Sequence, residues 1–345
     1  MIDLRSDTMT IPTKDMLQAV SNARFGDDVY GEDPSVNELQ EYVAAFLGKE
    51  DALFVPSGTM GNQICVHIHT NPGDEIIMEE QAHIFYYETA ASALLSGIQI
   101  KPLPSFHGIM NPMHVLKSIR PDVYYFPKTT LICIENTHNR HSGAVTPLKN
   151  IENIKQIADE HNIALHCDGA RLWNAATALN IAPKEIAKYF DSLSVCLSKG
   201  LGAPVGSVIV GKKEFIQKAL KFRKILGGGV RQAGILASAG LFAIKNNYSK
   251  LAEDHFNAKE FAFILSELKF INIEPEFIET NIVIFNLSDK INSDDFCKEC
   301  KNKGLLLNSV GNNSIRCVFY YQISYQEMLA ASEIIKDVLL NLSRK

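Results

Sequence analysis

Three polar segments carry the side chains best suited to chemistry, and each follows an apolar run that predicts a β-strand. Ser57-Gly58-Thr59 follows one of these strands, Asp168 ends a second and Lys199 follows a third. The carboxyl ends of parallel strands meet at one edge of a sheet, where such sheets bind their ligands. The sequence therefore predicts one site that contains a glycine turn, an acid and a lysine.

Each of these groups matches one part of pyridoxal phosphate (PLP). Backbone N–H groups at a helix start bind the phosphate dianion, a carboxylate pairs with the pyridine nitrogen, and a lysine amine condenses with the aldehyde. A charge pair at about 4 Å is worth about 4 kcal/mol at an effective dielectric constant near 20, enough for Asp168 to keep the ring nitrogen protonated. An isolated Asp or Lys at a strand end, such as Asp168 or Lys199, is more often a turn residue or a solvated charge. The ordered set of glycine turn, acid and lysine, however, predicts a PLP site.

Three pairs of potential metal ligands each lack the rest of a coordination set. A C-x-x-C pair needs two more ligands, and histidines two apart on a helix point to different faces. The third pair is accompanied by no carboxylate–histidine constellation and is interpreted as part of a polar loop. The pairs are Cys297 with Cys300, His67 with His69, and His138 with His141. We expect no metal.

Two glycine-containing segments resemble nucleotide-binding loops without matching them. Gly206 to Lys213 has the spacing of a phosphate-binding loop, but position 213 is Lys where Ser or Thr is required, and the residues between are mostly apolar. Gly200-x-Gly202 lacks the third glycine of a dinucleotide fingerprint. The sequence does not support a nicotinamide cofactor.

Length and composition limit the class of protein. A chain of 345 residues with 46% hydrophobic residues builds about two domains with full cores. A net charge of −5 is unlike that of nucleic-acid-binding proteins, and no apolar run is long enough to span a membrane. The polar N-terminus is unlike a secretory signal, and the seven cysteines fit a reducing compartment. We expect a cytoplasmic protein with neither nucleic-acid nor membrane partners.

Short β-rich runs alternate with helical patterns, as in a mostly parallel sheet joined by crossover helices. One helix is predicted to begin with a capping box at Ser35 and Glu38 and to end at Gly48, and the three glycines at 227–229 break a helical region. Strands are predicted at 52–55, 75–78, 98–103, 131–135, 163–168, 192–198, 207–210, 282–285 and 314–319, and C-terminal helices at 293–303 and 325–342. These elements predict a large domain at 1–248 that includes the N-terminal segment, and a small α/β domain at 249–345.

The whole chain resembles the L-threonine aldolase family of fold-type I PLP enzymes. The resemblance rests on LRSDT at 4–8, GDDVYG at 26–31, ENTHN at 135–139, DGAR at 168–171 and LSKGLG at 197–202. It implies an α/β fold like that of aspartate aminotransferase, with a mostly parallel sheet flanked by helices in the large domain and a smaller C-terminal α/β domain.

The resemblance also implies the cofactor site. Lys199 would be the Schiff-base lysine, Asp168 would pair with the pyridine nitrogen, and His83 would stack on the ring face. The full expected cofactor set is Ser57, Gly58, Thr59, His83, Asp168, Arg171, Lys199, Lys224 and Arg231.

Substrate binding is implied in the same way. Arg171 and Arg316 would hold the substrate carboxylate with help from Ser6, and Tyr30 would lie on a loop close to the site. Arg316 stands in an apolar strand, where an arginine needs an anionic partner.

Lys224 and Arg231 flank the triple glycine. In similar proteins cations of this segment reach the phosphate of a neighbouring subunit. The resemblance therefore implies active sites shared in a dimer, within a homotetramer.

Tyr125 departs from the family pattern. It stands where better-known relatives often carry a second active-site histidine, and a phenol with a pKa near 10 is a poor general base at neutral pH. This departure bears on the preference between L-threonine and L-allo-threonine.

The implied activity is that of an aldehyde-lyase, a low-specificity L-threonine aldolase. It would cleave L-threonine or L-allo-threonine to glycine and acetaldehyde by retro-aldol cleavage of the Cα–Cβ bond, in glycine biosynthesis. His83, directly or through a water, would remove the hydroxyl proton, with bulk water as the alternative base. Two other classes remain open: a different PLP enzyme, such as a β-eliminating lyase or an aminotransferase, and a non-catalytic protein that retains the fold.

Overall fold

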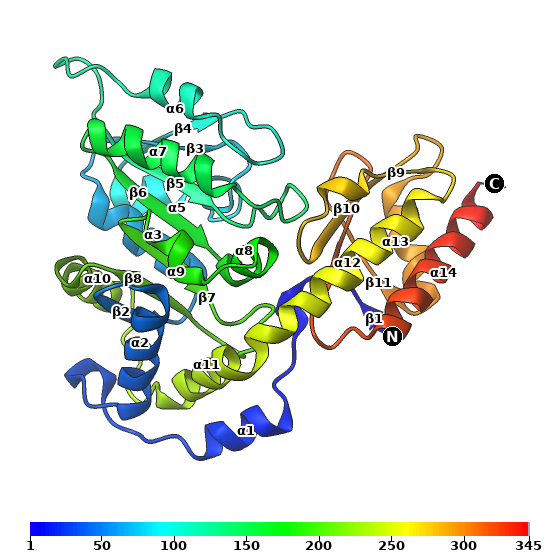
Figure 1. Cartoon of the computed structure of the whole chain (residues 1–345), viewed down its shortest axis with the longest axis horizontal. Helices are drawn as coiled ribbons and strands as arrows, with labels where there is room; N and C mark the ends of the chain where they lie inside the picture. The colour runs from blue at the N-terminus through cyan, green and yellow to red at the C-terminus, as the bar shows by residue number, and fades with distance from the viewer. Residues whose placement is uncertain (344–345) are drawn as a thin grey trace.

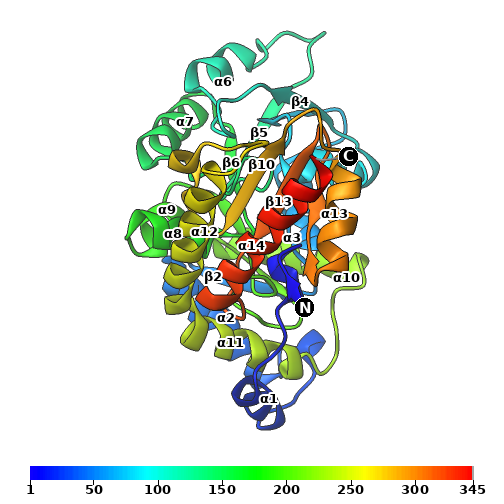
Figure 2. The ribbon, with the colours of Figure 1, turned by 90° about the vertical axis from the view of Figure 1, so that its right-hand side faces the viewer.

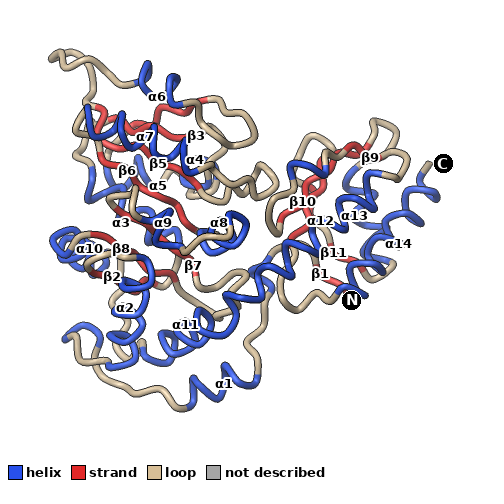
Figure 3. The backbone as a smooth tube through the Cα atoms, viewed as in Figure 1, coloured by secondary structure: helices blue, strands red, loops and turns tan. Residues whose placement is uncertain are grey.

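A seven-stranded sheet with helices on both faces forms the larger part of the molecule (Figures 1 and 3). A computed structural model describes residues 1–343. Along the sheet the strands run in the order β2-β8-β7-β6-β5-β3-β4, and β8 alone is antiparallel to its neighbours. Their bounds are β2 Asp51–Val55, β3 Glu75–Glu79, β4 Gln99–Leu103, β5 Thr129–Glu135, β6 Ala164–Gly169, β7 Ser192–Cys196 and β8 Ser207–Gly211. The predicted parallel α/β sheet is confirmed.

Alternate residues of each strand point to opposite faces, and apolar side chains occupy both. In β2, for example, Phe54 packs in the cluster beneath α2, and Leu53 and Val55 pack in a separate cluster with α3 and α10. Both faces are therefore buried, as in other parallel sheets. The helices of this part are α1 Lys14–Ser21, α2 Pro34–Leu47, α3 Gly58–His69, α4 His83–Tyr86, α5 Ala91–Ser96, α6 Pro112–Ser118, α7 Leu148–Glu160, α8 Leu172–Leu179, α9 Pro183–Ala187, α10 Lys213–Ile225 and α11 Gly234–Asn247.

The C-terminal unit lies against one side of the large sheet (Figure 2). It contains α12 Leu251–Ser266, α13 Ser293–Asn302, α14 Tyr325–Leu342 and an antiparallel sheet in the order β12-β13-β10-β9. The strands are β9 Ile271–Asn272, β10 Ile282–Leu287, β12 Asn308–Ser309 and β13 Ser314–Val318. Its apolar cluster is separate from those of the large sheet, which supports the division at residue 248; that boundary stays a prediction.

The N-terminal strand belongs to the C-terminal unit by its contacts. β1 (Ile2–Asp3) pairs in parallel with β11 (Leu305–Leu306), and Leu4 is part of the C-terminal apolar cluster. The next residues then cross to the large sheet. The first residues are thus packed into the C-terminal unit, and they join both parts of the molecule.

The start of α2 differs from the predicted capping box. Asp33 is the N-cap, and its buried carboxylate accepts hydrogen bonds from the N–H groups of Ser35 and Val36 and from that of Gly234 at the start of α11. Ser35 instead bonds the backbone of Arg24. The capping-box prediction was wrong because Asp33 also serves a second helix, a contact that local spacing does not show.

Asp33→Ala is expected to lower the free energy of unfolding by about 2–4 kcal/mol. The loss combines a helix cap, worth about 1 kcal/mol, with a buried Gly234 N–H left without an acceptor, worth about 1–3 kcal/mol. Urea unfolding of the variant measures it. Glu38→Ala, at the exposed position of the rejected capping box, is the control and is expected to change stability by less than about 0.5 kcal/mol. Equal losses in both variants would contradict the assignment of the cap.

Candidate functional site

A cavity of about 260 Å³ opens where the predicted strand ends meet. Its lining contains all three polar segments singled out in the sequence, together with His83 from α4. We call it the inner cavity; it is lined by Pro56, Ser57, Gly58, Thr59, Asn62, His83, Asp168, Ala170, Cys196, Ser198, Lys199, Pro204 and Val205. The convergence of the glycine turn, the acid and the lysine is therefore confirmed as a matter of geometry.

The glycine turn forms the start of α3. Ser57 is the N-cap, and its hydroxyl accepts the N–H of Met60. Gly58 and Thr59 follow as the first helical residues, where N–H groups have no acceptor within the helix. These free donors and the positive end of the helix dipole suit a phosphate group.

Asp168 stands at the end of β6, almost completely buried. One carboxylate oxygen accepts the N–H of Ala170 at 3.1 Å, and the other accepts the side-chain amide of Asn62 at 2.9 Å. Each carboxylate oxygen can accept a further hydrogen bond. Asp168 is thus held in place by two donors and retains the capacity to accept a third from a group in the inner cavity.

His83 is linked to Asp168 through a buried acid that the sequence analysis did not identify. Its Nδ1 donates to Glu88 at 2.9 Å, and Asn62 donates to both Glu88 and Asp168, each at 2.9 Å. Burial lowers the pKa of His83, but the hydrogen bond to Glu88 and the charges of Asp168 and Glu135 outweigh it and raise the pKa. The imidazole is therefore oriented and made more basic by its surroundings.

Arg171 forms a buried ion pair with Asp7. Its Nε and Nη2 each donate to one carboxylate oxygen at 2.7 Å, and Nη1 donates to Asn139 at 3.3 Å. Burial alone raises the pKa of Asp7, but Arg171 and the charge of Lys199 hold it below the usual value. Arg171 thus links the end of β6 to the N-terminal segment. Asp7 belongs to the LRSDT motif at 4–8, but the motif alone did not predict this ion pair.

Arg316 lies beside Arg171 and has no carboxylate partner among residues 1–343. Its Nη1 donates to the same Asn139 oxygen at 3.0 Å and its Nη2 to the backbone oxygen of Arg5, but its Nε is buried without any acceptor. Burial and the charge of Arg171 lower the pKa of Arg316. A buried guanidinium with an unused donor fits an anionic ligand.

Arg316 lines a second cavity of about 560 Å³, which we call the outer cavity. His83 lines both cavities, so the two meet at this side chain. The outer cavity is lined by His83, Tyr86, Tyr87, Asn139, Arg140, Asn308, Ser309, Val310 and Arg316. A ligand in the inner cavity therefore faces Arg316 across His83.

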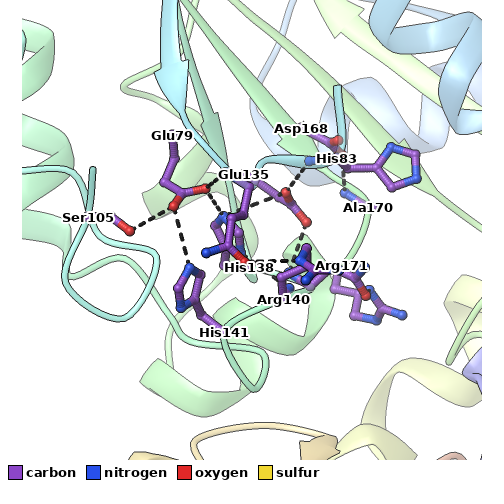
Figure 4. Close-up of polar contacts among 12 residues, drawn as sticks. Glu79, His83, Ser105, Glu135, His138, Arg140, His141, Asp168, Ala170 and Arg171 are labelled. Carbon is purple, nitrogen blue, oxygen red and sulfur yellow. Dashed lines mark hydrogen bonds and ion pairs between the residues drawn. The ribbon is translucent and has the colours of Figure 1, made fainter. Parts of the chain in front are cut away.

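Glu135 positions two of these residues from the end of β5 (Figure 4). One carboxylate oxygen accepts the N–H of His83 at 2.7 Å, and the other accepts the N–H of Asn139 at 2.9 Å. Glu135 and Asn139 both belong to the ENTHN motif, so the signal was present in the sequence. The contact between Glu135 and Asn139 lies within this motif, but the contact between Glu135 and His83 joins residues 52 positions apart, and local sequence does not show it.

Other predicted residues lie outside the two cavities of a single chain. Ser6 caps the short helix at Asp7–Met9, and Tyr30 is 74% exposed. Lys224 is exposed at the end of α10, and Arg231 pairs with Asp27 at the surface. Tyr125 is 65% exposed on the loop after α6. Their predicted roles at the site stay predictions.

His138 and His141 do converge on a carboxylate, contrary to the sequence analysis. Their Nε2 atoms lie 2.9 and 3.4 Å from the two oxygens of Glu79, which also accepts a hydrogen bond from Ser105 (Figure 4). The prediction failed because Glu79 comes from β3, which is beside β5 in the sheet but far from it in sequence. His138 Nδ1 accepts the N–H of Arg140, so its Nε2 carries the proton that Glu79 accepts.

The residues of the inner cavity fit PLP by their chemistry. The inner cavity is lined by four kinds of group: a helix start with free N–H groups, a buried carboxylate that can accept another hydrogen bond, an imidazole and a primary amine. Arg316, with its unused donor, stands beyond His83. This donor set matches a phosphate, a pyridine nitrogen, a ring face and an aldehyde, with an anionic group next to them.

The chain is similar to known proteins along nearly its whole length. A family model described as beta-eliminating lyase matches residues 3–289. Low-specificity L-threonine aldolase 1 of Arabidopsis thaliana is 40% identical over 99% of this chain and 97% of its own length. The low specificity L-threonine aldolase of Escherichia coli strain K12 is also 40% identical, over 95% of this chain and 96% of its own.

Solved structures show the same fold. Leishmania major threonine aldolase matches with a TM-score of 0.81 at 18% identity, covering 98% of this chain and all of that one. A serine palmitoyltransferase structure that holds PLP matches with a TM-score of 0.79 at 15% identity, covering 99% and 88%. The chain belongs to the low-specificity L-threonine aldolases, within the beta-eliminating lyase family.

Proposed function

We propose that this protein is a PLP-dependent aldolase that cleaves L-threonine and L-allo-threonine to glycine and acetaldehyde. The observation that carries the proposal is the inner cavity, which brings Ser57-Gly58-Thr59, His83, Asp168 and Lys199 to one space beside Arg316. The 40% identical relatives named for this activity support it. The reaction is the cleavage of a Cα–Cβ bond by an aldehyde-lyase.

The cofactor would be held by residues of the inner cavity. The start of α3 would bind the phosphate, Asp168 would accept the ring N–H, His83 would lie against the ring face, and the Lys199 amine would hold the aldehyde. When bound, PLP supplies an electron sink for the pair left on Cα as the Cα–Cβ bond breaks. Asn62 and Ala170 keep the Asp168 carboxylate oriented for this contact.

Arg316 would bind the substrate carboxylate with its unused Nε, and Arg171 would add a hydrogen of Nη1. Asn139 holds both guanidinium groups by one oxygen, and Asp7 fixes Arg171. Ser6 lies in the same N-terminal segment. Fixing the carboxylate would set the rotation about the N–Cα bond of the substrate. This contact would therefore select which bond of Cα is aligned to break.

His83 would accept the proton of the β-hydroxyl, directly or through a water. It lines both cavities, its Nδ1 is committed to Glu88, and its Nε2 is the remaining nitrogen. A positioned base of this kind is typically worth about 10²–10⁴-fold in rate. The raised pKa of His83 strengthens it as an acceptor while limiting its neutral fraction at low pH.

Assembly and location complete the proposal. Lys224 and Arg231 are exposed and lie outside their own cavity, next to the exposed apolar side chains of Ile225 and Val230. Such a surface suits contact with a neighbouring subunit, whose phosphate site these two cations would complete. The assembly would be a homodimer within a tetramer. Tyr30 lies on the same surface. All seven cysteines are free thiols, which fits the cytoplasm, with glycine formation as the role there. No helix in residues 1–343 is long and apolar enough to cross a membrane.

Lys199→Ala is expected to lower kcat/KM for L-threonine by at least about 10³-fold, because no other amine lines the inner cavity. The variant is also expected to lose the visible absorbance that the wild type gains on binding PLP. Lys212→Ala, an exposed position at the start of α10, is the control and keeps both properties. Full activity and absorbance in Lys199→Ala would contradict the assignment.

Product analysis separates the proposal from the other enzyme classes. Wild-type protein with PLP and L-allo-threonine is expected to release glycine and acetaldehyde in equal amounts. Release of ammonia and a keto acid instead would identify a β-eliminating lyase. A chain that binds no PLP would be a non-catalytic member of the fold.

Glu88→Gln is expected to move the acid limb of the kcat/KM profile to lower pH. His83 acts as a base in its neutral form, so the acid limb of the profile follows its pKa. Glu88 raises this pKa through its hydrogen bond and its charge, and replacing Glu88 with Gln therefore lowers it. Glu80→Gln, at an exposed position nearby, is the control. An unmoved limb in Glu88→Gln would exclude His83 as the base.

Tyr125→His tests the departure from the family pattern. Tyr125 lines neither cavity, so the ratio of kcat/KM for L-threonine and L-allo-threonine is expected to stay within about twofold of the wild type. Steady-state kinetics with both substrates measure it. A larger change in the ratio would show that Tyr125 reaches an active site from a neighbouring subunit.

A further inference from the structure

The outer cavity is lined by two arginines and by no acidic residue. Arg316 and Arg140 both line it, and its other lining residues are neutral apart from His83. A smaller cavity of about 150 Å³ contains the same two arginines and again no Asp or Glu. The substrate's α-carboxylate accounts for one of these positive charges. The second, on Arg140, has no role in the proposed reaction.

Arg140 has polar contacts but no counter-charge. Its Nε donates to the side-chain oxygen of Gln81 at 3.0 Å, and its Nη1 donates to the hydroxyl of Tyr87 at 2.7 Å. The guanidinium lies 4.4 Å from the ring centroid of Tyr86. In the described part of the chain, no carboxylate oxygen comes within 4.0 Å of Arg140, in contrast to Arg171.

The unused donors of Arg140 form one edge of the guanidinium. An arginine has five N–H hydrogens, and the two hydrogen bonds use that of Nε and one of Nη1. Both hydrogens of Nη2 and the second of Nη1 remain. This end of the group is the edge that pairs with a carboxylate through two parallel hydrogen bonds.

Arg140 is placed on the side of His83 that faces away from Lys199. The ring of Tyr87 lies 5.6 Å from that of His83, and the Tyr87 hydroxyl accepts the hydrogen bond from Arg140. His83 separates the inner cavity, with Lys199, from the outer one, with Arg140. With the substrate carboxylate on Arg316 as proposed above, the group beyond Cβ of the substrate would extend to this outer side. Arg140 lies in the loop that also carries His138, whose Nδ1 accepts the Arg140 N–H (Figure 4).

Resting on the proposed function, we propose that Arg140 is a specificity-determining residue that selects β-hydroxy-α-amino acids whose side chain ends in a carboxylate. The simplest such substrate is 3-hydroxyaspartate. Its cleavage breaks the Cα–Cβ bond, the hydroxyl loses its proton and becomes the aldehyde of glyoxylate, and Cα gains a proton to give glycine. No oxidant or further reactant is required.

A purely structural role for Arg140 is the alternative. Its stacking on Tyr86 and its bonds to Gln81 and Tyr87 would then only support the loop that carries Asn139. Such a role affects charged and neutral substrates equally. The charge of the substrate side chain therefore distinguishes the two roles.

The test compares 3-hydroxyaspartate with 3-hydroxyasparagine, which has the same shape without the charge. For the PLP-loaded wild type, kcat/KM is expected to be at least about tenfold higher for the acid than for the amide, mainly through KM. In Arg140→Gln this preference is expected to disappear. Lys149→Gln, which removes an exposed positive charge on α7, is the control for net charge and keeps the preference. Equal losses on both substrates in Arg140→Gln would overturn the proposal.

A measurement on the wild type alone protects the test against a variant that does not fold. L-Aspartate is expected to inhibit L-threonine cleavage at least about tenfold more strongly than L-asparagine, because it offers the same second carboxylate. Equal inhibition would overturn the proposal for Arg140 even if threonine is cleaved. Absence of threonine cleavage would instead refute the proposed function, so the two failures are distinguishable.

Discussion

The buried ion pair between Asp7 and Arg171 is the interaction on which the rest of the site depends. Arg171 follows β6 of the large sheet, and Asp7 follows a strand that pairs with the C-terminal unit. Asn281 at the start of β10 also donates to Asp7. Because a buried charge without its partner is strongly destabilising, this contact fixes the two parts of the molecule against each other at the site. It thereby brings Arg316, on β13, close to Asn139 and the strand ends.

Two buried acids organise the side chains of the proposed site on the other side of this pair. Glu88 connects His83 to Asp168 through Asn62, and Glu135 holds the backbone of both His83 and Asn139. Glu135 uses one carboxylate oxygen for each of its two partners, and one oxygen of Glu88 accepts from both His83 and Asn62. Residues that touch a ligand are thus held in place by residues that do not, and the shape of the site is set before any substrate arrives.

Local patterns in the sequence predicted the elements and the residues at strand ends. The strands that position Asp168 and Lys199 were found because apolar runs with polar ends need no information from elsewhere in the chain. Glu88, Asn62 and the pairing of Asp7 with Arg171 were not found. These are contacts between residues up to 164 positions apart, and their residue types alone are compatible with many partners. The Asp33 cap and the convergence of His138 on Glu79 were missed for the same reason.

The pairing of distant strands has a consequence for the order of folding. β2 is an edge strand whose neighbour in the sheet is β8, and Ile2 pairs with Leu305. During synthesis the turn at Ser57 cannot take its place until residue 211 has been made, and Asp7 cannot be fixed until the chain has passed residue 305. Synthesis must therefore pass residue 305 before the proposed site can form, and a chain that stops short of this residue carries Lys199 without the contacts that complete the site.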